Sequence, residues 1–325
     1  MPGLDVALQV ITDPYILGLI FVGTIGGVLV GALPGLSSSM ATALLLPFSL
    51  YLDPIPAIAL LASLYCAGTF GGSITAILIN APGAPPAAAT AFDGYPLAQR
   101  GEAGRALGMA AVSSVAGGTF SVLVLLIAAP LLAQVAYSFG PAEYFALAVF
   151  GLSMLSSISG KGASKNLIGG CLGLLIATVG VDLTTGVERF TFGMPQLYEG
   201  IHFIPVLIGL FAITELLSQA AKLREKVVAI GVSALKLPSL ADFRQVKYTI
   251  MRSCGIGTFI GILPAEGSTM AAMIGYNEAK RWSKTPTEFG EDSIEGIAGP
   301  EAANNAATGG SLAPTLALGI PGSAT

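Results

Sequence analysis

Charged residues are scarce in this sequence. Asp, Glu, Lys and Arg make up 10% of the 325 residues, whereas 53% are hydrophobic, and a soluble domain carries about 25% charged residues. So few charges cannot build a water-facing surface for a chain of this length, which excludes a soluble globular protein. No basic cluster interleaved with aromatics indicates a nucleic-acid partner. The composition predicts an all-α, polytopic membrane protein in a lipid bilayer.

Histidine and cysteine are scarce as well. His202 is the only histidine, which excludes multi-histidine metal sites and argues against a Ser/His protease. The cysteines Cys66, Cys171 and Cys254 stand singly in apolar stretches, so we expect inert, buried thiols. The sequence also lacks a nucleotide-binding loop and the serine-hydrolase and zinc-protease motifs. We therefore predict no enzymatic activity, no cofactor and no ATP hydrolysis by this chain.

Basic residues are absent from the first 99 positions, so a cleaved signal peptide, which needs a basic start, is not expected. A membrane helix needs about 20 apolar residues, fewer where it is broken. The apolar runs predict membrane segments at 15–33, 40–51, 56–80, 106–136, 141–159, 166–181 and 200–220. A polar loop is expected at 93–105.

A basic segment, residues 222–252, sets the predicted orientation. It contains seven Lys or Arg residues against two acidic ones, and the positive-inside rule places it in the cytoplasm. Counting spans back from there places the N-terminus outside. The chain thus divides into residues 1–221, holding a first repeat and the spans after it, the linker 222–252, and 253–325, the start of a second repeat. Because the sequence stops inside this repeat, we interpret it as part of a longer protein.

A Pro/Gly/Ser motif that breaks an apolar helix occurs twice, 230 positions apart. The copies are Gly31-Ala-Leu-Pro-Gly-Leu-Ser-Ser-Ser-Met40 and Gly261-Ile-Leu-Pro-Ala-Glu-Gly-Ser-Thr-Met270. Gly71-Gly-Ser73 follows the first copy and Gly309-Gly-Ser311 the second. The surrounding charges make the first copy enter the membrane from outside and the second from inside. This predicts inverted repeats with re-entrant or broken helical hairpins, as in secondary transporters, and by analogy an elevator-like motion.

The hairpin tips are the predicted substrate site. A half-helix that begins at a break offers unpaired N–H groups and about half a positive charge, which with nearby hydroxyls suits a carboxylate. The alternative is that the serines only cap a kinked helix. The predicted substrate-binding residues are Pro34, Gly35, Ser37, Ser38, Ser39, Asn80, Pro82, Gly83, Gly267, Ser268, Thr269, Pro321 and Gly322.

Amide and acidic side chains near the breaks are the candidates for ion coupling. The amide oxygens of Asn80, Asn304 and Asn305 suit Na⁺ or a substrate hydroxyl; the alternative is hydrogen bonding between helices. Glu301 is expected at a helix N-terminus. Glu266, at the second tip, either acts at membrane depth or lies in water. We predict ion coupling through Asn80, Glu301, Asn304 and Asn305, with Na⁺ or H⁺ as the ion and no other metal.

A set of motifs resembles a known family. They are Gly31-Ala-Leu-Pro-Gly-Leu36, Gly71-Gly-Ser-Ile-Thr-Ala-Ile-Leu-Ile-Asn-Ala-Pro-Gly83, Asp93-Gly-Tyr-Pro-Leu97, Arg189-Phe-Thr-Phe-Gly193, Pro300-Glu-Ala-Ala-Asn-Asn305 and Leu318-Gly-Ile-Pro-Gly-Ser323. With them the sequence resembles the large membrane subunit, TctA type, of the tripartite tricarboxylate transporter family.

The resemblance implies a permease of the bacterial inner membrane that works with a small membrane subunit and a periplasmic substrate-binding protein. It also implies import of tricarboxylates or related organic carboxylates by symport with Na⁺ or H⁺. The alternative from a different class is a channel or passive pore for small anions, because paired half-helices also build selectivity sites.

Overall fold

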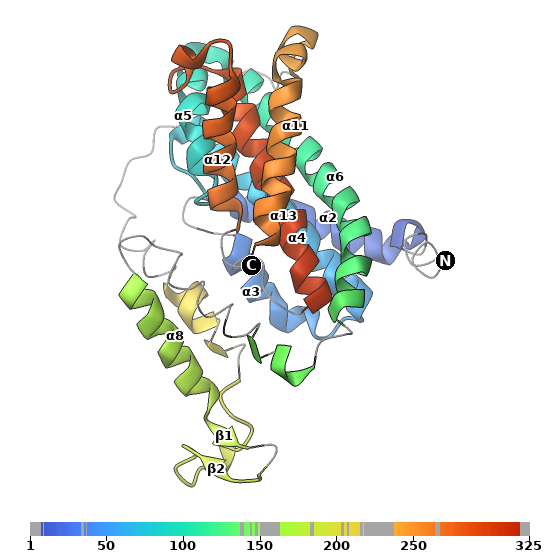
Figure 1. The fold of residues 1–325 in the computed structure, drawn as a ribbon, viewed down its shortest axis with the longest axis vertical. Helices are drawn as coiled ribbons and strands as arrows, with labels where there is room; N and C mark the ends of the chain where they lie inside the picture. The colour runs from blue at the N-terminus through green and yellow to red at the C-terminus, as the bar shows by residue number, and fades with distance from the viewer. Residues whose placement is uncertain are drawn as a thin grey trace. The chain divides into compact units, whose positions relative to one another are not determined.

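The computed structural model in Figure 1 is built almost wholly of helices. Three stretches of its described part are long and apolar enough to cross a membrane: Pro14–Gly31, Pro54–Ile79 and Ala87–Leu132. The predicted all-α, polytopic membrane fold is therefore confirmed. The structure describes residues 8, 10–33, 36, 38–136, 140–143, 145–146, 149, 163–182, 185–202, 205–206, 208–214, 217, 237–263 and 267–318.

The chain forms two compact units, Met1–Tyr137 with Glu215–Thr325, and Ser138–Thr214. The first unit contains α2 (Pro14–Gly31), α3 (Ser38–Ser49), α4 (Pro54–Ile79), α5 (Ala87–Leu97), the π-helical turn η1 (Ala98–Glu102), α6 (Ala103–Ala136), α11 (Leu240–Ile262), α12 (Gly267–Trp282), η4 (Pro286–Glu288) and α13 (Ile294–Leu318). The second contains α8 (Ala163–Ala177), β1 (Gly180–Val181), β2 (Glu188–Arg189), η2 (Pro195–Leu197) and η3 (Ile208–Ile213).

In the second unit, β1 and β2 pair antiparallel, with Gly180 opposite Arg189. An ion pair of 2.9 Å between Arg189 and Asp182 closes the turn between them. The predicted segments 141–159 and 200–220 lie largely outside the described residues.

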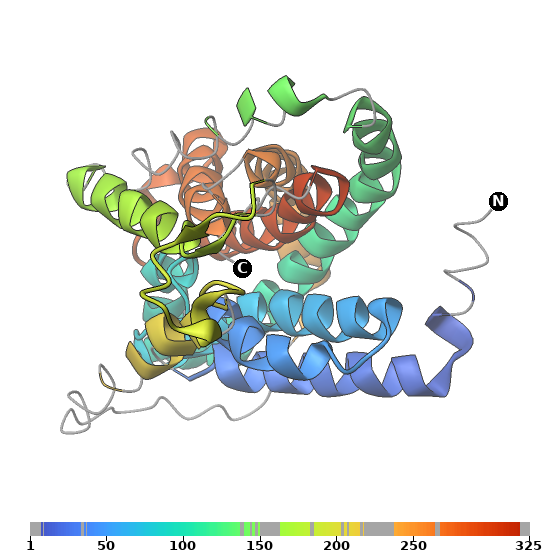
Figure 2. The same cartoon turned by 90° about the horizontal axis from the view of Figure 1, so that it is seen from below.

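Glycines of α2 lie directly on the backbone of α4. A Cβ added at Gly27 would come within 2.4 Å of the Leu64 carbonyl oxygen, and one at Gly31 within 2.2 Å of the Gly68 carbonyl oxygen. The two helix backbones approach more closely here than any side chain would allow, so both positions require glycine. Figure 2 shows the two helices side by side over most of their length.

The pair formed by α11 and α13 repeats this packing. A Cβ at Gly257 would lie 2.1 Å from the Ala303 carbonyl oxygen, and one at Gly261 would lie 2.4 Å from that of Ala307. The contacting residues correspond to those of the first pair at a shift of 230 positions in the first helix and 239 in the second. The duplicated sequence motif thus belongs to a duplicated helix contact.

The same contacts correct one detail of the sequence repeat. A Cβ at Gly71 would meet the Val28 carbonyl oxygen at 2.6 Å, and one at Gly310 would meet that of Thr258 at 2.4 Å. Val28 and Thr258 are equivalent, so Gly71 corresponds to Gly310 and not to Gly309. The match between Gly71-Gly-Ser73 and Gly309-Gly-Ser311 is one residue out of step.

Helix α13 is the centre of the first unit. It packs against α4, α5, α6, α11 and α12, and Figure 1 shows it behind α11 and α12. Every residue from Ser293 to Ser311 is buried. A helix enclosed on all sides is normally apolar throughout, so the polar residues within α13 need a reason.

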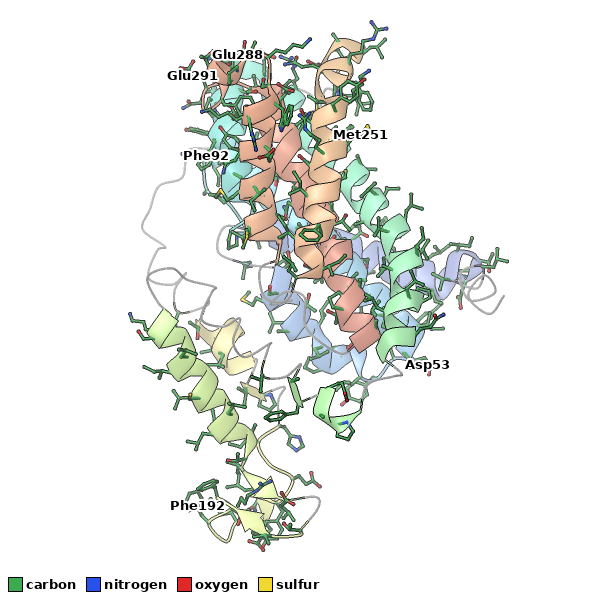
Figure 3. All side chains as sticks on the ribbon, viewed as in Figure 1. Asp53, Phe92, Phe192, Met251, Glu288 and Glu291 are labelled. Carbon is green, nitrogen blue, oxygen red and sulfur yellow. The ribbon has the colours of Figure 1, made fainter. Side chains whose placement is uncertain are left out.

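Large apolar side chains cover the outside of the first unit. Phe21 on α2 and Phe259 on α11 are each 66% exposed, and Figure 3 shows Phe92 of α5 and Met251 of α11 on the outer side of their helices. In a membrane such side chains contact lipid or another subunit.

Three local expectations are wrong. Residues 93–105 do not form a loop: they are helical, divided among α5, η1 and α6, with a break at Gly101, whose φ of 85° is not helical. The segment 222–252 is not all linker, because α11 begins at Leu240, where a capping box joins Ser239 and Asp242. Of the cysteines expected to be buried, Cys171 is exposed, Cys66 is partly buried and only Cys254 is buried.

Candidate functional site

A buried carboxylate occupies the middle of the first unit. Glu301 is 0% exposed, and none of the ion pairs found among the described residues involves it. It lies inside α13, seven positions after Ile294, so the expectation that it begins a helix is wrong. An acidic side chain at such a depth is costly and is by default a functional candidate.

Three hydroxyls from three different helices surround this carboxylate. Ser73 of α4 and Thr90 of α5 both donate to Oε1, the latter at 2.5 Å. Ser114 of α6 donates to Oε2 at 2.8 Å. We call these three residues, together with Glu301, the hydroxyl cage. Within the described structure the three hydroxyls stabilise the carboxylate by hydrogen bonds, without an ion pair.

Asn305 supports the cage from the next turn of α13. Its Nδ2 donates to the Ser114 hydroxyl at 2.9 Å and to the Glu301 carbonyl oxygen at 3.1 Å. The hydrogen bond between helices, one alternative for this amide, is therefore present. Asn305 thus holds the Ser114 hydroxyl that donates to Glu301; both of these hydrogen bonds use its Nδ2, and neither uses the amide oxygen.

Asn304 differs from its neighbour. It is 1% exposed, and neither its Oδ1 nor its Nδ2 has a hydrogen-bond partner within the described structure. A buried amide without partners is rare in native proteins and points to a ligand or water at that place. Three residues from Glu301, it lies on a neighbouring part of the same helix face.

Further polar side chains continue along this face of α13 towards α4. Thr308 lies 3.8 Å from the Cys66 sulfur, and the Ser311 hydroxyl lies 3.3 Å from that of Tyr65. We call Glu301, Asn304, Thr308 and Ser311 the polar seam. At 1.5 Å per residue it is about 15 Å long, or half of a bilayer core.

The first hairpin motif assembles beside the cage. The Gly83 N–H donates to the Gly72 carbonyl at 3.2 Å, and a Cβ on Gly83 would lie 1.9 Å from the Gly31 carbonyl oxygen. Three parts of the motif that are distant in sequence therefore touch. Ser73, the residue after Gly72, reaches from this junction into the cage.

Asn80 is placed differently from the other coupling candidates. It ends α4 in a left-handed conformation, with φ of 52°, and is exposed. None of the hydrogen bonds described for the cage involves it. Pro82 is partly buried and Gly83 is buried.

The tips of the hairpins are described in part. Ser38, the first residue of α3, is 6% exposed, and its hydroxyl lies against Gly68. Ser39 is partly buried. The predicted site residues Pro34, Gly35, Ser37, Pro321 and Gly322, and the candidate Glu266, lie outside the described residues.

In the second hairpin, Gly267 begins α12 at a positive φ of 48°, which favours glycine. Ser268 is partly buried and Thr269 is exposed. Just after each copy of the motif a helix begins, α3 at Ser38 and α12 at Gly267, and the N–H groups of a helix's first turn have no partner within the helix.

The start of α13 is fixed by Asp93. Its Oδ1 accepts hydrogen bonds from the backbone N–H groups of Gly290 and Ser293, at 2.9 and 2.8 Å. A Cβ on Gly296 would come within 2.1 Å of its Oδ2. A carboxylate close to a helix N-terminus stabilises it, so the Asp93-Gly-Tyr-Pro-Leu97 motif anchors the helix that carries Glu301.

The sequence predicts Glu301, Asn304 and Asn305 as site residues but does not predict the hydroxyls that surround Glu301. Ser73 belongs to a motif recognised in the sequence, but no role is predicted for its hydroxyl. Thr90 and Ser114 are single hydroxyl residues in apolar stretches, and no local signal sets them apart from the others.

Comparison with known proteins agrees with these features. The family model described as "Tripartite tricarboxylate transporter TctA family" matches residues 17–325. The Agrobacterium vitis protein "Uncharacterized 52.8 kDa protein in TAR-I ttuC' 3'region" is 43% identical over 301 residues, which cover 93% of this chain and 60% of that protein. This chain therefore spans about 60% of the relative's length.

A second Agrobacterium vitis protein, "Uncharacterized protein in TAR-II ttuC' 3'region", is 51% identical over 65 residues, or 20% of this chain and 27% of that protein. No solved structure matches the chain. Because the family model matches almost every residue, the chain belongs to the tripartite tricarboxylate transporter TctA family.

Proposed function

We propose that this protein is the permease subunit of an ion-coupled secondary transporter that imports tricarboxylates or related organic carboxylates. The observation that carries the proposal is the buried, hydroxyl-bound Glu301 beside the first hairpin motif. A static pore has no evident need of a carboxylate without a counter-charge at its centre, whereas a carrier uses such a group to couple ion and substrate.

The substrate binds between the two hairpins. The half-helix N-termini at Ser38 and Gly267 favour an anion. Hydroxyls of Ser37–Ser39 and Ser268–Thr269 add donors, and the breaks at Pro34-Gly35, Asn80–Gly83 and Pro321-Gly322 bring backbone groups to it. The family membership and these donors support an anionic substrate.

The coupling ion, Na⁺ or H⁺, binds at the polar residues of α13. Glu301 supplies the charge, Asn304 an unpartnered amide and Asn305 a support for the cage. Asn80, exposed at the end of α4, contributes to the site only if the hairpins move towards it.

The two copies lie in the bacterial inner membrane as inverted repeats, with the N-terminus outside and 222–252 in the cytoplasm. Transport proceeds by an elevator-like movement of the hairpins. A small membrane subunit and a periplasmic binding protein, which hands over the substrate, complete the transporter. The family membership and the placement of Lys and Arg support this arrangement.

The test is uptake of a panel of labelled carboxylates by cells that express the complete chain with its partner subunits. We expect one carboxylate to accumulate against its gradient, and an ionophore to abolish the accumulation. Ser38→Ala combined with Ser268→Ala should weaken substrate binding at least several-fold and leave membrane insertion intact. If the substrate only equilibrates across the membrane and does not accumulate, the protein is a passive pore. If the double variant binds substrate with normal affinity, the two serines only cap their helices.

A further inference from the structure

We propose that the coupled ion is a proton and that Glu301 carries it. This inference rests on the proposed function, because it names the ion of the same transport cycle. Glu301 binds the proton together with the substrate on one side of the membrane and releases it on the other.

The surroundings of Glu301 leave its charge unbalanced. Of the titratable groups on the elements packed around α13, Tyr65 and Cys66 lie at Ser311 and Thr308, and Arg105 pairs with Asp242. None of the others forms a described hydrogen bond or ion pair with the Glu301 carboxylate: Asp93 and Tyr95 on α5, Arg244, Lys247, Tyr248, Arg252 and Cys254 on α11, and Tyr276, Glu278, Lys280 and Arg281 on α12. A buried carboxylate without a counter-charge takes up a proton or binds a cation.

The hydroxyl cage accommodates both protonation states. The Ser114 hydroxyl accepts from Asn305, so its own hydrogen points to Glu301 Oε2. Ser73 and Thr90 share Oε1, and a hydroxyl is both a donor and an acceptor. When H⁺ from water bonds to Oε1, one of these hydroxyls turns and accepts the new O–H; breaking that O–H returns H⁺ to water and restores the carboxylate with three donors.

The hydrogen bonds of the cage favour a proton over Na⁺. Thr90 and Ser114 lie 2.5 and 2.8 Å from the Glu301 oxygens, within the range of O–H···O hydrogen bonds. Each of these hydroxyls aims its hydrogen at the carboxylate, whereas a bound Na⁺ would need their lone pairs, so the hydroxyls would first have to turn away. A proton added to Oε1 requires only one hydroxyl to turn.

Asn304 links this proton site to the substrate. It stands about 4.5 Å along the helix axis from Glu301, and its free Nδ2 suits a carboxylate oxygen or a bridging water. A negative substrate held there is repelled by ionised Glu301 and tolerated by the protonated form. Proton and substrate therefore bind together.

The decisive variant is Glu301→Gln, which keeps the shape and stays neutral. The complete natural chain with its partner subunits is reconstituted into vesicles, and labelled substrate is followed with a pH gradient and, separately, in exchange without one. We expect Glu301→Gln to lose at least ten-fold of the accumulation driven by the pH gradient. It should retain exchange, which becomes independent of pH.

The matched control is Glu295→Gln. Glu295 is another buried carboxylate of α13, 7% exposed and bound by the hydroxyls of Thr249 and Ser283. It lies in the first turn of the helix, away from the polar seam. Glu295→Gln should keep both accumulation and the pH dependence of exchange.

A second pair of variants keeps the test informative if Glu301→Gln does not assemble. Thr90→Val is nearly isosteric and removes one donor to the carboxylate, so the ionised form loses support and the midpoint of the pH profile of exchange should move up by about half a unit or more. Thr249→Val removes one donor to Glu295 and should leave the profile in place.

Three results would overturn the inference. One is accumulation by Glu301→Gln under a pH gradient as in the wild type, and another is an unmoved midpoint in Thr90→Val. The third is wild-type accumulation that follows a Na⁺ gradient at uniform pH and ignores a pH gradient, which would leave the proposed function standing. A wild type that accumulates no carboxylate under either gradient would remove the proposed function as well.

Discussion

The repeated helix contact makes a quantitative prediction about one methyl group. Gly27→Ala adds a Cβ that would lie 2.4 Å from the Leu64 carbonyl oxygen and 2.9 Å from both the Ala67 Cβ and the Gly68 nitrogen. Ordinary contacts of carbon with oxygen are about 3.3–3.6 Å. Helices α2 and α4 must therefore separate by about 1 Å at this point.

The magnitude follows from two opposed terms. Overpacking of this kind costs about 1–3 kcal/mol, while replacing glycine by alanine inside a helix returns about 0.8–1.0 kcal/mol. Gly18, on the same helix, has nothing within 4 Å of an added Cβ, so Gly18→Ala shows only the favourable term. The two variants should differ in free energy of unfolding by about 1–3 kcal/mol, with Gly27→Ala the less stable.

The assay is unfolding of the purified protein in detergent, with both variants measured beside the wild type. The second copy repeats the experiment: a Cβ on Gly257 would lie 2.1 Å from the Ala303 carbonyl oxygen, whereas Gly255 has open space. Gly257→Ala should again fall below Gly255→Ala. If either crowded variant is as stable as its control, the close helix contact inferred for that copy is wrong.

Two further predictions concern topology and pH. Single cysteines at residues 53 and 236 should react with an impermeant thiol reagent from opposite faces of the membrane, and labelling from the same face would rule out the inverted arrangement. Burial alone would raise the pKa of Asp242, but hydrogen bonds from Arg105 and Ser239 outweigh it and hold the pKa below its ordinary value. This contribution to stability is present above about pH 4 and is lost as the pH falls through the lowered pKa. Asp242→Asn should therefore lower stability at neutral pH by about 1 kcal/mol, since Arg105 is partly solvent-screened, and should matter less towards pH 3; a difference that stays constant with pH would contradict the assigned ion pair. Asp53→Asn, which removes a helix-start carboxylate without a capping hydrogen bond, is the control.

The helices of the repeats could be predicted because their signal is local. The predicted runs 15–33 and 56–80 correspond to Pro14–Gly31 and Pro54–Ile79. Hydropathy over some 20 residues decides whether a segment enters a membrane. Pro14 and Pro54 are the first residues of their helices, a position that proline favours because no N–H is needed there.

The error at 93–105 shows where local signals fail. Asp93, Arg100, Glu102 and Arg105 look like a solvated loop by composition. In the fold Asp93 is buried against the start of α13, Arg100 pairs with Asp292 and Arg105 pairs with Asp242. Each partner is more than 130 positions away, so composition alone could not supply it.

The two copies also differ at the residues that matter most. With the 239-position shift set by the glycine contacts, Glu301, Asn304 and Asn305 of α13 correspond to Ala62, Tyr65 and Cys66 of α4. The copies therefore share the glycine contacts that fix how the helices cross, while only the second carries the carboxylate and the amides.

This asymmetry explains why the motif alone did not reveal the site. Close helix contact makes the same demand for glycine in both copies, so the repeat is visible in the sequence. The Glu301 carboxylate occurs in the second copy only, and its donors come from α4, α5 and α6, of which only α4 belongs to the repeated helix pairs. The caged carboxylate thus lies where the repeat is broken: Glu301 departs from its counterpart, and Ser73, in the first copy, donates to it.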